Sequence, residues 1–209
     1  MGLNKEIKHH LKETLDEKRY RHTLNVRHTA IRLANAHLKF DDPVHRNIYL
    51  EKVSLAALIH DIDKQKDPKL LMEQLEKEGG LILEDIRDSR MVWHAFTAAI
   101  AARDQFGITD PDILNAVRYH TTGRQGMTDL EKIIYLADYI EPGRRFSGVE
   151  EIRKASEQGL DEGTLAALDH SIDHLAARGI KISPLTLRAR KDIMDHGIFR
   201  QKKERANSI

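Results

Sequence analysis

Apolar residues recur at helical spacing along most of the chain. Ile7, Leu11 and Leu15 lie four positions apart, which predicts a first helix with Asn4 as its N-cap. The same pattern predicts further helices beginning near residue 19, at Pro43 and at Pro68, over roughly 90–105, 111–120, 128–140, 148–157 and 162–178, and from Pro184 onward. No segment alternates as a strand does. The sequence therefore predicts an all-α fold.

Proline and glycine mark the ends of several of these segments. Asp67-Pro68 is typical of a helix start, and Gly79 and Gly179 lie where helices end. No repeat or low-complexity linker interrupts the chain. We expect a single domain over residues 1–195, with the C-terminal helices packed on the same core, followed by a polar tail over residues 196–209.

Composition excludes several classes of protein. Of 209 residues, 40% are hydrophobic and 32% are charged, which is typical of a globular protein. The net charge of +1 provides no overall field to attract nucleic acid. No cysteine is present, so thiolate metal sites and disulfides are excluded. No apolar run reaches the ~18 residues of a membrane-spanning helix. We expect a cytoplasmic protein without nucleic-acid or membrane partners.

His60-Asp61 is the first candidate for chemistry, because it follows the apolar run Val53–Ile59. Burial of an imidazole and a carboxylate is costly unless the two groups are paired or bind a metal. A capping pair at a helix end is the simpler alternative for this dipeptide.

Four further residues of the same kind lie in apolar helical segments: His22, His94, His120 and Asp138. A buried ion pair with an arginine is the alternative for Asp138, and a core position is the alternative for each histidine. Five candidates on apolar helices are far less expected by chance than one. The remaining histidines, at positions 9, 10, 28, 37, 45, 170, 174 and 196, match no pattern and are assigned to surface or packing roles.

The order His, His-Asp, His, His, Asp resembles the HD-domain phosphohydrolase superfamily. The segments Arg118-Tyr-His-Thr-Thr-Gly-Arg124 and Leu130-Glu-Lys-Ile-Ile-Tyr-Leu-Ala-Asp-Tyr-Ile-Glu-Pro142 are similar to the long motif of its bacterial symmetrical diadenosine tetraphosphate hydrolases. The resemblance covers roughly residues 15 to 190. It implies an HD-type helical bundle and hydrolysis of diadenosine tetraphosphate to two ADP, and leaves a homodimer open.

The resemblance also assigns roles to residues. It implies that iron is held by His22, His60, Asp61 and Asp138, with other divalent metals able to substitute, and that a second metal could lie at His94 and His120. Asp61, His94 and His120 are the candidate catalytic residues. The candidate nucleotide-binding residues are Arg19, Lys64, His94, His120, Thr121, Arg144, Lys181, Ile182, Ser183, Pro184, Leu185 and Thr186.

Three residues depart from the family pattern: Thr97 replaces an expected glycine, Gly143 an asparagine and Ser147 a proline. They leave the metal set intact and put substrate preference in question. The first alternative function is another HD-type hydrolase that acts on a nucleoside mono- or triphosphate. The second is a non-catalytic nucleotide-binding module, which would be favoured by missing metal ligands.

Overall fold

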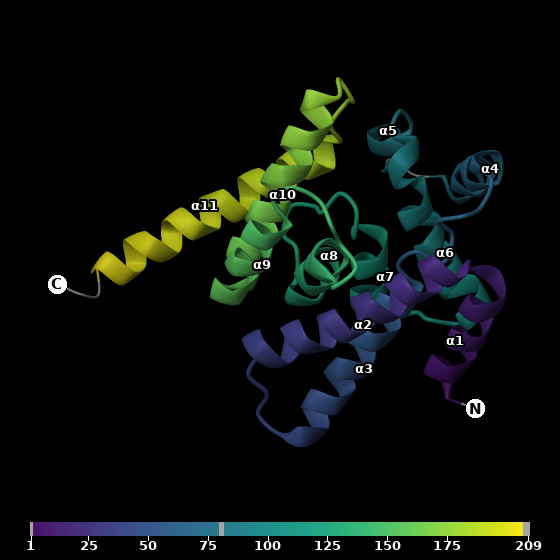
Figure 1. Ribbon diagram of the computed structural model, residues 1–209, viewed down its shortest axis with the longest axis horizontal. Coiled ribbons are helices and arrows are strands. Elements are labelled where there is room, and N and C mark those ends of the chain that lie inside the picture. The colour runs from purple at the N-terminus through teal and green to yellow at the C-terminus, as the bar shows by residue number, and fades with distance from the viewer. Residues whose placement is uncertain (1, 80–81, 207–209) are drawn as a thin grey trace.

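The computed structural model describes residues 2–79 and 82–206, and over these ranges its regular elements are all helices, without strands (Figure 1). The predicted all-α fold is therefore confirmed. In chain order the elements are α1 (Leu3–Thr14), α2 (Glu17–His37), α3 (Pro43–Ile59), α4 (Pro68–Glu78), α5 (Ile82–Ile86), the 3-10 turn η1 (Arg90–Val92), α6 (Trp93–Phe106), α7 (Pro111–Arg118), α8 (Asp129–Ile140), α9 (Val149–Gln158), α10 (Leu160–Ala177) and α11 (Pro184–Ala206).

Short polar side chains begin the helices that carry the core. Asp42, Asp67 and Asp110 each precede a proline and accept a hydrogen bond from a backbone N–H of the first turn. Proline suits this position because its missing N–H would have had no partner there. Thr128 begins α8 with a reciprocal capping box to Glu131. These local signals fix where each helix starts.

The core lies where α2, α3, α7 and α8 pack together. Its largest fully buried side chains include Leu58 of α3 and Ile133 and Tyr135 of α8. Along α3 every residue from Val53 to Ile59 is buried, so that this helix carries the chain directly into His60 and Asp61 inside the molecule. In Figure 1, α7 and α8 lie centrally and α11 extends away from the other helices.

Several boundaries differ from those predicted. Gly2, not Asn4, is the N-cap of α1; Asn4 instead accepts a hydrogen bond from Ser54 at 2.8 Å. The short α5 was not predicted, and the segment predicted to begin near 90 begins with η1 before α6. With only five residues, α5 is too short to show helical periodicity in the sequence.

At the C-terminal end, α10 begins at Leu160, and α11 continues to Ala206 across the predicted boundary between residues 195 and 196. The extent of the domain and of the polar tail stays a prediction. Among the residues described, no helix combines the length and the hydropathy that crossing a membrane requires.

Candidate metal centre and nucleotide cavity

Five elements far apart in sequence deliver the predicted metal-binding side chains to one place. Groups of three such side chains have ligand atoms within 4.8 Å of one another. The contributors are α2 (His22), the end of α3 and its following turn (His60, Asp61), the first turn of α6 (His94), the turn after α7 (His120) and α8 (Asp138). The structure thus brings together all six residues that the sequence singled out.

Asp61 is the centre of this cluster. Its Oδ1 lies 3.1 Å from Nε2 of His94 and 3.5 Å from Nε2 of His120. Its Oδ2 lies 3.6 Å from Nε2 of His60 and 3.7 Å from Nε2 of His22. Each carboxylate oxygen therefore faces a different pair of histidines.

The histidine tautomers fit a metal centre. Nδ1 of His60 donates to the carbonyl of Ala57 at 2.7 Å, and Nδ1 of His120 donates to the carbonyl of Val117 at 2.7 Å. Each Nε2 then carries a lone pair that is directed into the cluster, is buried and has no hydrogen-bond partner among the described residues. Buried polar atoms without partners are costly, and coordination of a cation would satisfy them. The residues present therefore fit a divalent metal.

A carboxylate, not a backbone carbonyl, holds His22. Nδ1 of His22 lies 3.2 Å from Oε1 of Glu141. Oε2 of Glu141 accepts from Nδ2 of Asn25 at 3.0 Å and from the amide of Gly143 at 2.5 Å. Burial favours a higher pKa for Glu141, but these hydrogen bonds outweigh it and lower the pKa. Glu141 was not among the predicted site residues, although it directly follows the apolar run in which Asp138 was noted.

Three basic residues surround the carboxylates. Arg19 donates to Oδ2 of Asp61 at 2.7 Å, and Arg144 forms an ion pair with Asp138. Lys64 Nζ lies 3.0 Å from Nε2 of His94 and 3.8 Å from Oδ1 of Asp61. A buried ion pair with an arginine was the alternative role for Asp138. This ion pair is present, and it lies in the same cluster as the histidines.

Burial determines the charge of two of the histidines, His60 and His94. It lowers the pKa of His60 to about 3 and that of His94 to about 4, against an ordinary value of 6.5, so both are neutral near pH 7. A neutral His94 suits a ligand or a proton acceptor better than an acid.

Both carboxylates of the cluster remain ionised. Burial alone would raise their pKa values, but His60 and its neighbours hold the pKa of Asp61 well below its usual range, and Arg144 does so for Asp138. Two carboxylates with neutral imidazoles form a nitrogen and oxygen donor set of the kind that iron, manganese and zinc accept.

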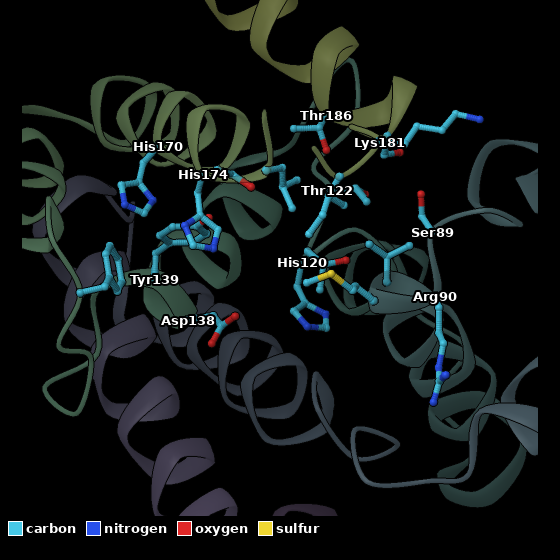
Figure 2. A pocket seen from close by; sticks show the side chains of 18 of the residues that line it. Ser89, Arg90, His120, Thr122, Asp138, Tyr139, His170, His174, Lys181 and Thr186 are labelled. Carbon is cyan, nitrogen blue, oxygen red and sulfur yellow. The ribbon is translucent and has the colours of Figure 1, made fainter. Parts of the chain in front are cut away.

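A cavity of about 860 Å³ lies beside the cluster. In Figure 2, His120 and Asp138 lie between one side formed by Tyr139, His170 and His174 and another that carries Ser89, Arg90 and Lys181. The predicted nucleotide-binding residues that line it are Lys64, His120, Thr121, Arg144, Lys181, Ser183 and Thr186.

Other predicted nucleotide-binding residues are not part of this lining. Arg19 and His94 contact Asp61. Leu185 packs in the small core cluster with Ile86 and Phe96. Ile182 and Pro184 are half-buried and do not line the cavity. Within the segment 181–186, the lining therefore comes from Lys181, Ser183 and Thr186.

Aromatic and imidazole rings on the cavity wall were not predicted as site residues. The ring of His170 lies 4.7 Å from that of Phe146 and stacks against His174 with an interplanar angle of 8°. Nε2 of His170 donates to the carbonyl of Ser147 at 2.9 Å, which fixes the ring. Both histidines lie on α10, four residues apart, and a pair at that spacing was the only signal in the sequence.

The comparisons with known proteins agree with this geometry. The family model described as "HD domain" matches residues 19–143. A "Bis(5'-nucleosyl)-tetraphosphatase, symmetrical" of Bacillus subtilis is 38% identical over 176 residues, covering 84% of this chain and 89% of the relative. Its namesake in Staphylococcus aureus is 37% identical, covering 81% and 79%.

A solved structure is also similar. The crystal structure of a predicted HD superfamily hydrolase involved in NAD metabolism from Clostridium acetobutylicum has a TM-score of 0.83 and 37% sequence identity. The match covers 92% of this chain and 97% of that one.

Proposed function

This chain belongs to the HD-domain family, among the symmetrical bis(5'-nucleosyl)-tetraphosphatases, and from that premise we propose that it hydrolyses diadenosine tetraphosphate to two ADP. The observation that carries the proposal is the position of Asp61, which lies within 3.8 Å of four histidines and two basic residues, in a cluster whose His120 and Asp138 line a large cavity. A hydrolase of phosphoanhydrides needs these features together: a metal-binding centre, cations for the phosphates and space for a nucleotide.

The His/Asp cluster supports a divalent metal, and we propose iron as its resident ion, held by His22, His60, Asp61 and Asp138. A second ion at His94 and His120 is supported by the two-sided contacts of Asp61. When bound, the metal supplies a Lewis acid that makes a water nucleophilic near neutral pH and offsets charge on the phosphoryl oxygens.

The protein's own side chains would orient the phosphates and handle the proton. Arg19, Lys64 and Arg144 lie within contact of the two carboxylates, so their positive charges are available to phosphoryl oxygens placed against the cluster. Asp61 is ionised and can accept the proton of the attacking water. His120 lines the cavity as well as the cluster, which favours a direct contact with the substrate.

The two sides of the cavity suit a substrate with two similar halves. Lys181 lies on one side of His120 and Asp138, and the rings of Tyr139 and His170 lie on the other (Figure 2). A central scissile bond placed over the cluster would direct one ADP half toward each side. Rings that line a pocket favour stacking with a purine base.

Hydrolysis in heavy-oxygen water tests the proposed reaction. We expect diadenosine tetraphosphate to give two ADP, of which one carries a single heavy oxygen on its terminal phosphate by mass spectrometry. Formation of AMP and ATP would contradict the proposal. Faster turnover of nucleoside mono- or triphosphates in the same assay would favour the alternative HD-type hydrolase. Metal analysis after anaerobic purification tests iron, and full activity with zinc alone would contradict it.

A further inference from the structure

His22, His60 and His120 of the cluster are not held in the same way. His60 and His120 donate through Nδ1 to carbonyls three residues earlier in their own segments, Ala57 and Val117. Local backbone geometry therefore sets their orientation. His22 has a partner 119 residues away, the carboxylate of Glu141. Its orientation consequently depends on how α2 and the end of α8 pack.

Glu141 is itself tightly held. Its side chain is 4% exposed, and it follows directly on α8, the helix that carries Asp138. Three donors converge on the carboxylate: His22 on Oε1, and Asn25 and the Gly143 amide on Oε2. Because His22 and Asn25 both lie on α2, the carboxylate joins the helix of one metal-binding residue to the helix of another.

Gly143 permits this arrangement. A Cβ atom at position 143 would lie 2.8 Å from Oε1 and 2.9 Å from Oε2 of Glu141, distances at which the carboxylate would have to move. Without a side chain, the backbone amide of Gly143 approaches to 2.5 Å and donates to Oε2. The residue that replaces the expected asparagine therefore contacts the group that orients His22.

We propose that Glu141 is a positioning residue for the metal centre: it holds His22 as the tautomer with its proton on Nδ1, so that Nε2 faces Asp61 and Asp138. The inference rests on the metal-binding part of the proposed function and is independent of which nucleotide is cleaved. Carboxylate partners of this kind fix ring orientation and increase the basicity of a histidine ligand. The structure places Nε2 of His22 3.0 Å from Oδ1 of Asp138, without hydrogen-bond geometry.

Glu141→Gln is the sharpest change. A glutamine has one acceptor oxygen for three donors. If that oxygen faces Asn25 and Gly143, the amide NH2 faces His22. The NH2 then favours the His22 tautomer with its proton on Nε2, and this Nε2 has no lone pair for a metal. If the oxygen faces His22 instead, the NH2 group lies against the N–H donors of Asn25 and Gly143, which need an acceptor. Either outcome disturbs the centre without removing bulk.

Glu131→Gln is the matched control. Glu131 is a buried glutamate on the same helix, but it accepts from Arg124 and caps the start of α8, away from the cluster. We expect Glu141→Gln to weaken equilibrium binding of ferrous iron or cobalt(II), measured anaerobically by chelator competition, by about 10- to 100-fold. Glu131→Gln should lower the thermal midpoint and change metal affinity by less than about 2-fold. Equal affinity of both variants and the wild type would overturn the proposal.

The tautomer can be measured without any metal. In metal-free protein labelled with ¹⁵N-histidine, long-range NMR correlations should show His22 protonated on Nδ1 in the wild type and in Glu131→Gln, and protonated on Nε2 or mixed in Glu141→Gln. An unchanged His22 tautomer would overturn the proposal. If Glu141→Gln does not fold, Asn25→Ala, which removes one donor to Oε2, should reduce metal affinity a few-fold, and no reduction would overturn it. Failure of wild-type protein to bind metal would instead refute the proposed function, while the tautomer result would still be readable.

Discussion

The inner cluster of metal-binding residues and the edge of the cavity both carry ionisable side chains, in very different surroundings. In the inner cluster, assembled from five elements, the side chains of His60 and Asp61 are 0% and 2% exposed. At the edge of the cavity, Lys181 and Asp88 form an ion pair at 2.8 Å in which both side chains are 68% exposed.

Solvent determines what each region can do. Exposed ion pairs contribute roughly 0–1 kcal/mol, because water screens them and long side chains lose entropy on pairing. A buried charge without its partner costs several kcal/mol. We therefore expect the inner cluster to decide whether chemistry occurs, and the edge to adjust how well a nucleotide binds. The following changes test that difference, from the largest expected effect to the smallest.

His60→Ala and Asp138→Ala should have the largest effect. Each removes a donor of the inner cluster, so bound metal should be lost and kcat should fall by about 100-fold or more, because no nucleophile then forms at neutral pH. Metal analysis, helicity by circular dichroism and steady-state rates provide the measurement. Lys181→Ala is the matched change at the edge and should retain its metal. Stoichiometric metal in both inner variants would remove the basis of the site.

Acid should destabilise the metal-free protein through the inner cluster. The folded pKa values of His60 and His94, about 3 and about 4, lie below the ordinary value of 6.5. The unfolded chain therefore binds more protons between these values, and stability that is present above pH 6.5 is lost as the pH falls.

Between pH 6.5 and pH 5, each of these histidines should lower the free energy of unfolding by roughly 2 kcal/mol. A difference of one full proton between the two states corresponds to ~1.4 kcal/mol per pH unit. Denaturant unfolding across this range measures the loss. His60→Ala should flatten the dependence by close to one proton. A pH dependence that is the same in the variant and the wild type would assign the effect to other groups.

Changes at the edge should alter KM and leave stability intact. Asp88 accepts a hydrogen bond from the ammonium of Lys181, which we expect to bind phosphate. Lys181→Ala should raise KM for diadenosine tetraphosphate by about 10-fold, as loss of one charged hydrogen bond would. Asp88→Asn should lower KM by 2- to 3-fold, because Lys181 is released. A thermal midpoint within about 1 °C of the wild type is expected for both, and a fall in kcat without a change in KM would contradict this role.

Gly143→Ala should also have a small effect, and it tests the inner cluster through Glu141. Residue 143 is exposed, yet its added Cβ would contact both carboxylate oxygens of Glu141. Metal affinity should fall by less than in Glu141→Gln, about 2- to 5-fold within the range of outer-shell changes. Gly126→Ala is the control, because Gly126 has a positive φ and an added Cβ there would have no atom within 4 Å. It therefore measures the loss of glycine's backbone freedom without crowding. Equal metal affinity in the two variants would show that the crowding has no consequence.

Local signals in the sequence were sufficient for most of the fold. Aspartate-proline starts and helical spacing placed α3 and α4 correctly, because capping and periodicity depend on neighbouring residues only. Where those signals were absent, as for the five-residue α5, the helix was not predicted, and where they were misleading, as for Asn4, the predicted boundary was wrong. Asn4 is polar and near a helix start, but its partner Ser54 lies 50 residues away.

The metal-binding candidates could also be recognised in the sequence, since a histidine or an acid inside an apolar run needs a partner wherever the chain folds. His22, His60, Asp61, His94, His120 and Asp138 stood out for this physical reason. Only the tertiary structure decided which atoms face one another. The two oxygens of Asp61 contact different pairs of histidines, and Glu141 contacts Nδ1 of His22. His170 and His174 line the cavity. These contacts join residues across 23 to 119 positions or depend on packing between helices, and hydrophobic patterning carries no information about such pairings.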